Sequence, residues 1–534
     1  MIPLHVHSYY TLLRGIVSPE KLISKAVEYN LKALAITDTN SMQGVIQFVK
    51  HARENNIKPI IGCTITDIQE KELYAILLAK NNTGYSDICK LITARKLNDD
   101  FSLINALQNN LPNLFIISPS IEIANSVHSK NDFYLELITT KKEKLNNRKR
   151  FDFAESKGIK TVAINPVFIQ KPEDYEIHKT VTSIRLNTSI DNLTEDDIID
   201  EDFYFKNPKL IEREWAAIPD TLKASEDIAG KCNTDLKLYK YKFPFYSLPH
   251  GETSESLLWK ETFKGLNKKY DKITDGIVKR LEMELSVIKE MGFCDYFLIV
   301  WDIVNEAKSR GMLTIGRGSA ANSLAAFCLG ITQIDPIEQN LYFERFLNKA
   351  RTSPPDFDID FSWKERDEII KYIFEKYGYE NVAMISTTVT FRARSAFRET
   401  AKAFGFTNTE ISRFSRRIPW TSASNLPNLS KLFPESKGLN FNIEPWKTIV
   451  NIASKIAGFP RHLSIHPGGI VITPTKITDY VALEYARNKG LGLIVTQPDM
   501  YSIEDLGLIK IDILSQRSLG VLRDTMESIK NNSE

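Results

Sequence analysis

The string Asp356-Phe357-Asp358-Ile359-Asp360 has the residue types and spacing best suited to chemistry. In a strand, alternate residues face the same side, so Asp356 and Asp358 project together while Phe357 and Ile359 pack behind them. Carboxylates on one face repel one another unless a cation lies between them. Mg²⁺ prefers oxygen ligands and accepts substrate phosphates in its shell. The string therefore predicts a magnesium site, with an acidic surface strand as the alternative.

Asp512 is a further carboxylate, and it lies inside an apolar run at residues 508–513. An aspartate in such a run is unfavourable when it has no partner. If Asp512 joined the first pair, it would gain a partner cation and complete a two-metal site for phosphoryl transfer. From the residues alone, a stray acid at the end of a strand is the other interpretation.

A turn rich in glycine and serine, residues 316–323, precedes the apolar run 324–329. Small residues let backbone N–H groups approach a phosphate closely, and the N-terminus of a following helix adds partial positive charge. Ser319 offers its hydroxyl to the same phosphate. The turn lacks the GK[ST] ending of a Walker A loop. It indicates a nucleotide site, and an ordinary loop with a helix N-cap is the alternative.

The elements that must position these residues differ along the chain. Up to about residue 240, short apolar runs alternate with amphipathic stretches, which is typical of a parallel α/β unit, open or closed into a barrel. The expected strands are residues 31–37, 58–62, 115–118, 133–138 and 160–164, and the expected helices include residues 19–29 and 42–55.

Beyond this unit the pattern changes. Residues 239–249 predict an extended connector, and residues 253–310 have a helical pattern. Residues 391–460 are expected to be mostly helical with a break at 419–434, and short strands return at 469–473, 493–496 and 508–513. The predicted fold class is α/β and α+β with several domains.

Composition sets wider limits on the class of protein. The chain has 534 residues, 43% of them hydrophobic and 25% charged, which is typical of a globular protein with three to four domains. Its five cysteines form no CxxC pair, which argues against a zinc ribbon or a disulfide framework and favours the cytoplasm. No signal peptide is expected, and no apolar run approaches the ~20 residues of a membrane helix.

Basic residues are concentrated between residues 391 and 420, although the net charge of the chain is only +2. Two acids, Glu399 and Glu410, stand in the same stretch. Such a concentration suits a nucleic-acid backbone, and a solvated helix face is the alternative. The basic residues are Arg392, Arg394, Arg398, Lys402, Arg413, Arg416 and Arg417.

Longer motifs resemble those of a known family. GRGSAANSLAAFCLGIT, LYFERFLNKARTSPPDFDIDF and GLIKIDILSQRSL resemble the palm signatures of the bacterial DNA polymerase III alpha family. LHVHSYYTLLRG and LAITDTNSMQG resemble its N-terminal PHP domain. The resemblance implies a PHP-type distorted (β/α)7 barrel at 1–240, then a palm of the polymerase beta-like nucleotidyltransferase fold at 241–395 and 466–534, and a helical thumb at 396–465.

The resemblance also implies roles for single residues in DNA synthesis. A primer 3′-hydroxyl would attack the α-phosphate of a deoxynucleoside triphosphate in a site with two Mg²⁺ ions, and Asp360 would support that site. The family pattern has glycine where Asn322 stands. The implied metal-binding catalytic acids are Asp356, Asp358 and Asp512; the implied nucleotide-binding residues are Gly318, Ser319, Arg345 and Lys510; and the implied contacts to primer–template DNA are Arg392, Arg394, Arg398, Arg413, Arg416 and Arg417.

The metal site of the PHP domain is expected to be vestigial. His5, His7 and Asp38 match the family's metal-binding positions. Other positions of that site hold residues that bind metal poorly: Arg14, Thr39, Thr64, Pro166 and Phe168. Since zinc or manganese needs three or four good ligands, a structural PHP domain without metal and without exonuclease activity is expected.

The family places the fingers, a clamp-binding region and an OB domain after the second palm segment. This sequence ends at Glu534, shortly after Asp512, with a polar stretch at 524–534 that suggests a frayed tail. The fingers are therefore expected to be absent, and a separate chain is one possible source of them. The sliding clamp and other replisome subunits would bind only through the absent regions. A polymerase and a polymerase-incompetent, DNA-binding scaffold are both compatible with the sequence, whereas the missing ligands argue against a PHP phosphoesterase.

Overall fold

The computed structural model describes residues 1–70, 72–349, 355–486 and 493–532. The chain divides into two compact units. The first contains Met1–Leu236, Thr388–Ser464 and Val481–Glu484. The second contains Lys237–Thr387, Ile465–Tyr480 and Tyr485–Glu534.

The first unit contains a six-stranded sheet in the order β1-β2-β3-β4-β5-β6. The strands are β1 (Ala33–Ile36), β2 (Lys58–Thr66), β3 (Tyr74–Ala79), β4 (Leu114–Ser118), β5 (Asp132–Ile138) and β6 (Lys160–Ile164). All five strands predicted for this region are present. The prediction of a parallel sheet was wrong for β3, which pairs antiparallel with both β2 and β4. The connection from Thr66 to Tyr74 is too short for the crossover that parallel strands require.

The N-terminal segment links the two ends of this sheet. The Ala35 and Thr37 N–H groups donate to the carbonyls of Pro3 and Val6 at 3.2 and 2.8 Å. On the other side, His7 N–H donates to Val167 O at 2.8 Å, just beyond β6. Residues 3–7 thus lie between the first strand and the continuation of the last, and this brings His5 and His7 into the interior.

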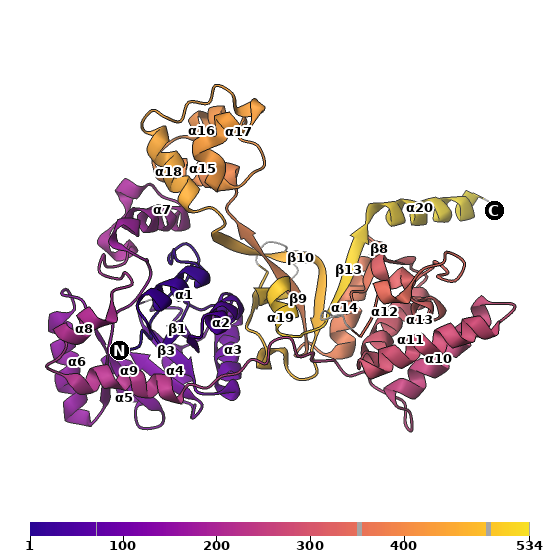
Figure 1. The fold of residues 1–534 in the computed structure, drawn as a ribbon, viewed down its shortest axis with the longest axis horizontal. Helices are drawn as coiled ribbons and strands as arrows, with labels where there is room; N and C mark the ends of the chain where they lie inside the picture. The colour runs from indigo at the N-terminus through magenta and orange to yellow at the C-terminus, as the bar shows by residue number, and fades with distance from the viewer. Residues whose placement is uncertain (71, 350–354, 487–492, 533–534) are drawn as a thin grey trace. The chain divides into compact units, whose positions relative to one another are not determined.

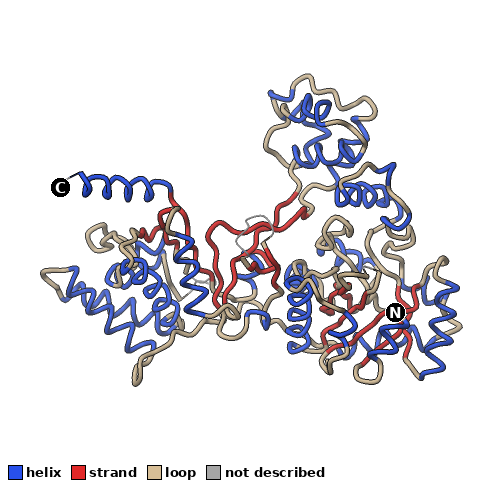
Figure 2. The backbone as a smooth tube through the Cα atoms, turned by 180° about the vertical axis from the view of Figure 1, so that it is seen from behind, coloured by secondary structure: helices blue, strands red, loops and turns tan. Residues whose placement is uncertain are grey.

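Helices surround this sheet in Figures 1 and 2. Ser18 caps the first helix by accepting from Lys21 N–H, which fixes where α1 begins. The longer helices of this part are α1 (Pro19–Glu28), α2 (Val45–Glu54), α3 (Asn82–Leu97), α6 (Lys144–Lys157), α7 (Tyr175–Leu186) and α9 (Pro219–Lys231).

Residues 388–464 of the first unit form a small helical bundle, as predicted. Its helices are α15 (Ala393–Ala403), α16 (Asn408–Ser415), α17 (Leu429–Leu432) and α18 (Trp446–Lys455). Aromatic rings fill the centre: Phe414 lies 4.3 Å and Phe397 5.9 Å from Trp446, measured between ring centroids. The predicted break at 419–434 was wrong for its central part, which forms a 3-10 helix at Ala423–Asn428 followed directly by α17.

The second unit contains a seven-stranded sheet in the order β11-β12-β9-β10-β13-β8-β7. The strands are β7 (Thr314–Arg317), β8 (Asp358–Ser362), β9 (Val382–Thr390), β10 (Pro460–Ile472), β11 (Leu483–Tyr485), β12 (Ile494–Asp499) and β13 (Lys510–Gln516). β13 is antiparallel to β10 and parallel to β8, while β7 is antiparallel to β8. The strands predicted from short apolar runs near the C-terminus are thereby placed in the middle of one sheet.

Most helices of this unit pack around the β7–β8 side of the sheet, whereas α19 packs against β12 (Figure 1). Helix α12 buries nine of its sixteen residues, and Phe297 from it contacts Phe357 with ring centroids 5.0 Å apart. The helices are α10 (Ser254–Lys269), α11 (Asp275–Glu290), α12 (Cys294–Ser309), α13 (Leu324–Cys328), α14 (Arg366–Tyr377), α19 (Met500–Asp505) and α20 (Arg517–Asn532).

The suggestion of a frayed tail from residue 524 was wrong for 524–532, because these residues continue helix α20. Leu519 and Gly520 anchor the start of that helix in the protein, where a Cβ on Gly520 would lie 2.9 Å from the Trp363 ring. In the described part of the chain, no helix combines the length and apolarity needed to cross a bilayer.

Candidate active site

The central feature of the second unit is the pairing of β8 with β13. The two strands run parallel with Asp358 opposite Asp512. On the far side of β13, Asp512 lies opposite Gly469 of β10. Two carboxylates that are far apart in the sequence therefore stand side by side on neighbouring strands, as a shared cation would require.

The remaining acids of the predicted string take different places. Asp356 precedes β8 rather than lying within it, and it is half-buried. Asp360 is buried, with its Oδ2 atom 3.4 Å from Gln516 Nε2 and 3.5 Å from Arg317 Nη1. Asp360 is thus held by neighbouring side chains, which fits the supporting role that the family resemblance implies.

Lys510 lies among the carboxylates. Its Nζ atom is 3.3 Å from Asp512 Oδ2, 3.6 Å from Glu504 Oε1 and 3.9 Å from Asp356 Oδ1. Burial opposes its charge, but Asp356, Asp512 and Glu504 together raise the pKa of Lys510. Glu504 was missed by the sequence analysis, and its spacing from Asp512 offered no signal. The lysine offsets part of the negative charge that the acids concentrate here.

Two observations show that the carboxylates have capacity for a further cation. Burial, followed by the charges of Asp512 and Asp356, raises the pKa of Asp358. Asp512 Oδ1 is buried and has no hydrogen-bond donor among the described residues. His466 Nδ1 lies 3.6 Å from that oxygen but accepts the N–H groups of Gly468 and Gly469 at 3.2 and 2.7 Å. Its lone pair is therefore engaged, and it does not donate to Asp512.

The oxygen donors of Asp358 and Asp512 suit magnesium. Within the described ranges, no three His, Cys, Asp or Glu side chains are gathered closely enough to form a metal site unaided. The paired Asp358 and Asp512 nevertheless supply oxygen donors, and the unpartnered Asp512 oxygen lacks only a cation. Mg²⁺ usually takes one or two carboxylates and completes its shell with water and substrate phosphate, so these residues fit it.

The predicted glycine–serine turn approaches this carboxylate pair. Arg317 of β7 lies opposite Asp358, and Gly318 follows with φ of +70°. A Cβ on Gly318 would lie 3.2 Å from Asp358 Oδ2. A residue without a side chain is therefore needed where the backbone turns beside the carboxylate. Ser319 follows in a 3-10 turn that ends at Asn322.

The expectation that the next helix would offer its N-terminus to a phosphate was wrong. Helix α13 begins at Leu324, and its Ala325 N–H already donates to Glu284 Oε2 at 3.1 Å. Ser323 Oγ donates to the same oxygen at 2.9 Å, and Arg280 Nε donates to Glu284 Oε1 at 2.7 Å. A buried carboxylate thus occupies the site that a phosphate would need. Asn322 turns its amide back onto Ser319 O at 2.9 Å.

Among the described residues, no side-chain contact joins Arg345 to the carboxylates. It lies at the end of a short 3-10 turn, Phe343–Arg345, and is exposed. Its predicted role in nucleotide binding stays a prediction.

The three predicted PHP residues meet in the interior of the first unit, but each is engaged by protein. His5 Nδ1 lies 2.9 Å from Glu136 Oε1, and Tyr74 OH donates to Glu136 Oε2 at 2.9 Å. Asp38 accepts from Ser8 N–H and Oγ and from Thr11 Oγ1 at 2.6 to 2.8 Å. Burial raises the pKa of Asp38 to about 6. Glu136 was missed, although an acid in the apolar strand 132–138 was the available signal.

His7 packs against Phe168, which stands at one of the positions where the sequence indicated that a metal ligand had been lost. Its ring stacks on Phe168 with centroids 3.9 Å apart, and Nε2 is buried without a partner in the described residues. Burial, His5 and Arg14 lower the pKa of His7. Phe168 lies against His7 where a ligand is expected, and the nearby positive charge of Arg14 opposes a bound cation, so this donor set is a poor fit for zinc or manganese.

The predicted DNA-contacting arginines fall into two groups. Arg394 donates to Ile418 O at 2.7 Å, and Arg398 lies 3.3 Å from Ser415 Oγ, so both bind their own bundle. Arg413, Arg416 and Arg417 line one cleft with polar residues of α16. Arg392 lies 5.4 Å from the ring of the exposed Trp420. Arg392, Arg413 and Arg416 are exposed, whereas Arg417 donates to the carbonyls of Glu435 and Lys437 in its own bundle.

Comparisons with known proteins define first the class of domains present. Residues 3–119 match the PHP domain family, and residues 256–515 match the bacterial DNA polymerase III alpha NTPase domain. Among curated relatives, the chain is 32% identical to an error-prone DNA polymerase of Symbiobacterium thermophilum, with 99% of this chain and 52% of the relative aligned. It is 34% identical to DNA polymerase III subunit alpha of Bacillus subtilis and to that of Buchnera aphidicola, with 99% of this chain and 49% of each relative aligned.

The chain therefore belongs to the bacterial DNA polymerase III alpha family. It spans about half the length of the curated relatives that it matches.

Proposed function

We propose that this chain carries the catalytic palm for template-directed DNA synthesis, transferring a deoxynucleotide to a primer 3′-hydroxyl. The observation that carries the proposal is the cross-strand pair of Asp358 and Asp512 with the unpartnered Asp512 Oδ1. Family membership supplies the substrates, primer–template DNA and deoxynucleoside triphosphates. Other replisome subunits belong to the proposal only as partners of the longer relatives.

Asp358 and Asp512, assisted by Asp356, would hold two Mg²⁺ ions. When bound, the ions would supply the positive charge that activates the hydroxyl and neutralises the leaving pyrophosphate. Lys510 keeps the acids together by offsetting their repulsion. The Gly318–Ser319 backbone turns beside Asp358 without a side chain between them, which leaves room for a triphosphate. Arg345 would add positive charge to that phosphate.

The finer architecture is part of the same proposal. The bonds from residues 3–7 to both ends of the first sheet support a distorted (β/α)7 barrel over residues 1–240. The carboxylate sheet supports a polymerase beta-like palm at 241–395 and 466–534, and the small helical bundle supports a thumb at 396–465. All five cysteines are buried free thiols, which supports a cytoplasmic location.

We also propose that the PHP domain serves a structural role without a bound metal and without exonuclease activity. The stacking of His7 on Phe168 and the positive charge of Arg14 near His7 support this. A stoichiometric metal that persisted after substitution of Asp358 and Asp512, but was lost after substitution of His5 and His7, would refute it.

Primer extension with Mg²⁺ and four deoxynucleoside triphosphates tests the palm. Asp358→Asn and Asp512→Asn keep side-chain shape and should each lower extension at least about a hundredfold, because two-metal catalysis depends on both carboxylates. The exposed Asp271→Asn is the matched control and should be unchanged. Mn²⁺ affinity, measured by electron paramagnetic resonance, reports the site independently of turnover. Normal Mn²⁺ and DNA binding without extension would favour the alternative, a scaffold that needs a separate chain with fingers. Extension unaffected by both substitutions would refute the palm assignment.

A further inference from the structure

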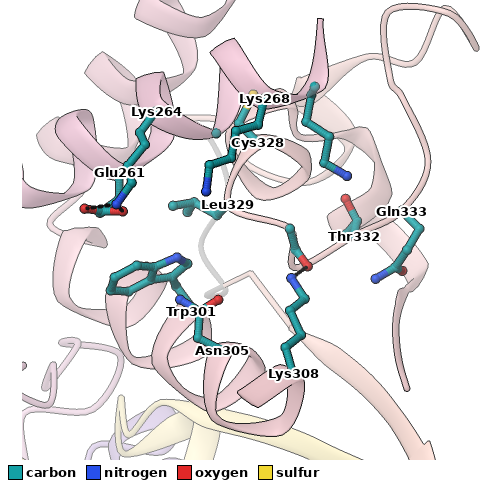
Figure 3. Close-up of a pocket in the computed structure, with 13 residues that line it drawn as sticks. Glu261, Lys264, Lys268, Trp301, Asn305, Lys308, Cys328, Leu329, Thr332 and Gln333 are labelled. Atoms are coloured by element: carbon teal, nitrogen blue, oxygen red, sulfur yellow. Dashed lines mark hydrogen bonds and ion pairs between the residues drawn. The ribbon is translucent and has the colours of Figure 1, made fainter. Parts of the chain in front are cut away.

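A basic cleft lies in the second unit. Part of its lining, within residues 328–332, falls inside the motif GRGSAANSLAAFCLGIT, but neither the family resemblance nor the proposed catalysis assigns a role to the residues of the cleft. It has a volume of about 470 Å³ and is lined by α10, α12, the end of α13 and the turn after it. Figure 3 shows Trp301 and Lys308 of α12 on one side, with Lys268 of α10 across from them. Its lining shares no residue with the predicted nucleotide set of Gly318, Ser319, Arg345 and Lys510.

Positive charge in the cleft exceeds negative charge. Four lysines line it, Lys264, Lys268, Lys269 and Lys308, against a single carboxylate, Glu261. That carboxylate is already bound to Lys264 at 3.2 Å. The other three lysines have no carboxylate partner in the described part of the chain: Lys308 donates to Gly330 O at 2.8 Å, and Lys269 lies 4.5 Å from the Phe327 ring centroid. Burial and the nearby charge of Lys269 lower the pKa of Lys308. A bound anion would relieve this repulsion.

A second observation, independent of charge, also points to a ligand. Thr332 lines the cleft and is fully buried, yet its Oγ1 has no hydrogen-bond partner among the described residues. Buried hydroxyls without partners are rare in native proteins, and an oxygen-rich ligand is one way to satisfy them. Trp301 adds a half-buried aromatic surface, and Asn305 adds an amide that both donates and accepts.

The cleft is built on rigid contacts. A Cβ on Gly265 would meet Cys328 O at 1.9 Å, so helix α10 lies directly on the end of α13. Thr332 also forms a parallel bridge with Gly316, which precedes the turn beside Asp358. The walls are therefore held in place, and one of them is joined to the strand that carries that turn.

We propose that this cleft binds a free nucleoside polyphosphate, with the phosphates on Lys268, Lys269 and Lys308 and the base against Trp301. The volume falls within the range of small-molecule sites. Lysine recognises phosphate as a point charge, and an aromatic ring beside it selects a ligand with a stackable base. Because Glu261 is the one carboxylate in the lining and is paired with Lys264, binding does not depend on a divalent metal.

Calorimetric titration of the full chain with ADP, and separately with inorganic tripolyphosphate, tests this in EDTA, where palm binding through metal is suppressed. The double substitution Lys268→Gln with Lys308→Gln should weaken the binding of both probes at least about tenfold, as expected for the loss of charge-assisted hydrogen bonds. Trp301→Leu should weaken ADP binding but leave tripolyphosphate binding unchanged. Thr332→Val, which keeps side-chain shape, should weaken ADP binding severalfold. The exposed Lys272→Gln is the matched control and should bind like the parent chain.

Lys510→Gln distinguishes this cleft from the palm and should not alter ADP binding in EDTA. Circular dichroism and thermal unfolding establish that each variant is folded before titration. Absence of ADP binding by the parent chain at millimolar concentration would overturn the proposal. Loss of ADP binding in Lys510→Gln but not in the Lys268/Lys308 variant would overturn it as well. Binding of a single-stranded oligonucleotide through these lysines, without binding of ADP, would also overturn the proposal.

Discussion

Gly318→Ala offers a quantitative test of the geometry beside Asp358. The residue has φ of +70°, a conformation in which an alanine is less favourable than glycine by about 1 kcal/mol. The new Cβ would also lie 3.2 Å from Asp358 Oδ2, closer than ordinary van der Waals contact. The carboxylate must then shift by a few tenths of an ångström, and its oxygen loses solvent.

Gly311→Ala separates these two effects. Gly311 has φ of +75°, but a Cβ there would meet nothing within 4 Å. Both variants should lower the free energy of unfolding by about 1 kcal/mol, since the backbone strain is the same. Only Gly318→Ala should lower kcat/KM for nucleotide incorporation, by about tenfold, because small misplacements of reacting groups have large effects on rate.

The pH dependence provides a second readout of the same variant. Burial and the neighbouring acids already raise the pKa of Asp358, and the added methyl group buries it further. The carboxylate must be ionised to hold a cation, so the acidic limb of the activity profile should move to higher pH in Gly318→Ala. Steady-state extension from pH 5.5 to 8.5 measures this. Equal activities and superimposable pH profiles for the two alanine variants would show that the turn does not control the carboxylate.

Three further predictions concern other parts of the structure. Burial lowers the pKa of His178 from 6.5 to about 4, so the neutral ring stabilises the fold above pH 6.5 and this contribution is lost as the pH falls towards 4. Chemical unfolding should show that the free energy of unfolding falls by about 1.4 kcal/mol between pH 7.5 and 5.5, and His178→Gln should remove this change. An equal pH dependence in both proteins would contradict the assignment. Glu284→Gln should lower the free energy of unfolding by about 3 kcal/mol, because Arg280 loses its charged partner and the single amide oxygen can accept from Arg280 or from the start of α13 but not from both. An unchanged urea midpoint would show that α13 does not need this carboxylate. The double substitution Arg413→Gln with Arg416→Gln should weaken binding to a primer–template duplex about tenfold and lower the salt dependence of that binding by about two phosphate contacts, whereas Arg394→Gln should chiefly destabilise the bundle through loss of its bond to Ile418 O. Fluorescence anisotropy across a salt series separates the two effects. A larger change in the salt dependence for Arg394→Gln would reverse the assignment.

Much of the fold was predictable because local pattern reflects burial. The run 508–513 is apolar around one acid, and the string 356–360 alternates acids with apolar residues; strands β13 and β8 of the sheet overlap these two segments. Their parallel pairing, and the placement of β13 between β8 and β10, depend on segments far apart in sequence. No local sequence pattern encodes which strands become neighbours in a sheet. The sequence therefore indicated which acids belong to the site without showing which of them face each other.

The residues that sequence analysis missed show where the reasoning can be extended. Asp512 attracted attention because it is an acid inside an apolar run, and the same argument applies to Glu136 within the apolar strand 132–138. Its partners, His5 of the N-terminal segment and Tyr74 of β3, supply the polar contacts that such burial requires. Glu284 and Glu504 lie on helices among other charged residues, where burial leaves no comparable signal in the sequence.

The occupation of the α13 N-terminus by Glu284 changes how a triphosphate must be held. Helix N-termini bind phosphate through free N–H groups, but here the first of these groups already donates to a buried carboxylate that Arg280 also binds. Under the proposed function, phosphate binding would rest on the Gly318–Ser319 backbone and on cationic side chains, and the metal ions would supply the larger share of the charge. Binding of a triphosphate should consequently depend more strongly on divalent metal than it does at sites built on a free helix N-terminus. The carboxylate pair of Asp358 and Asp512 would thereby control substrate binding as well as the chemical step.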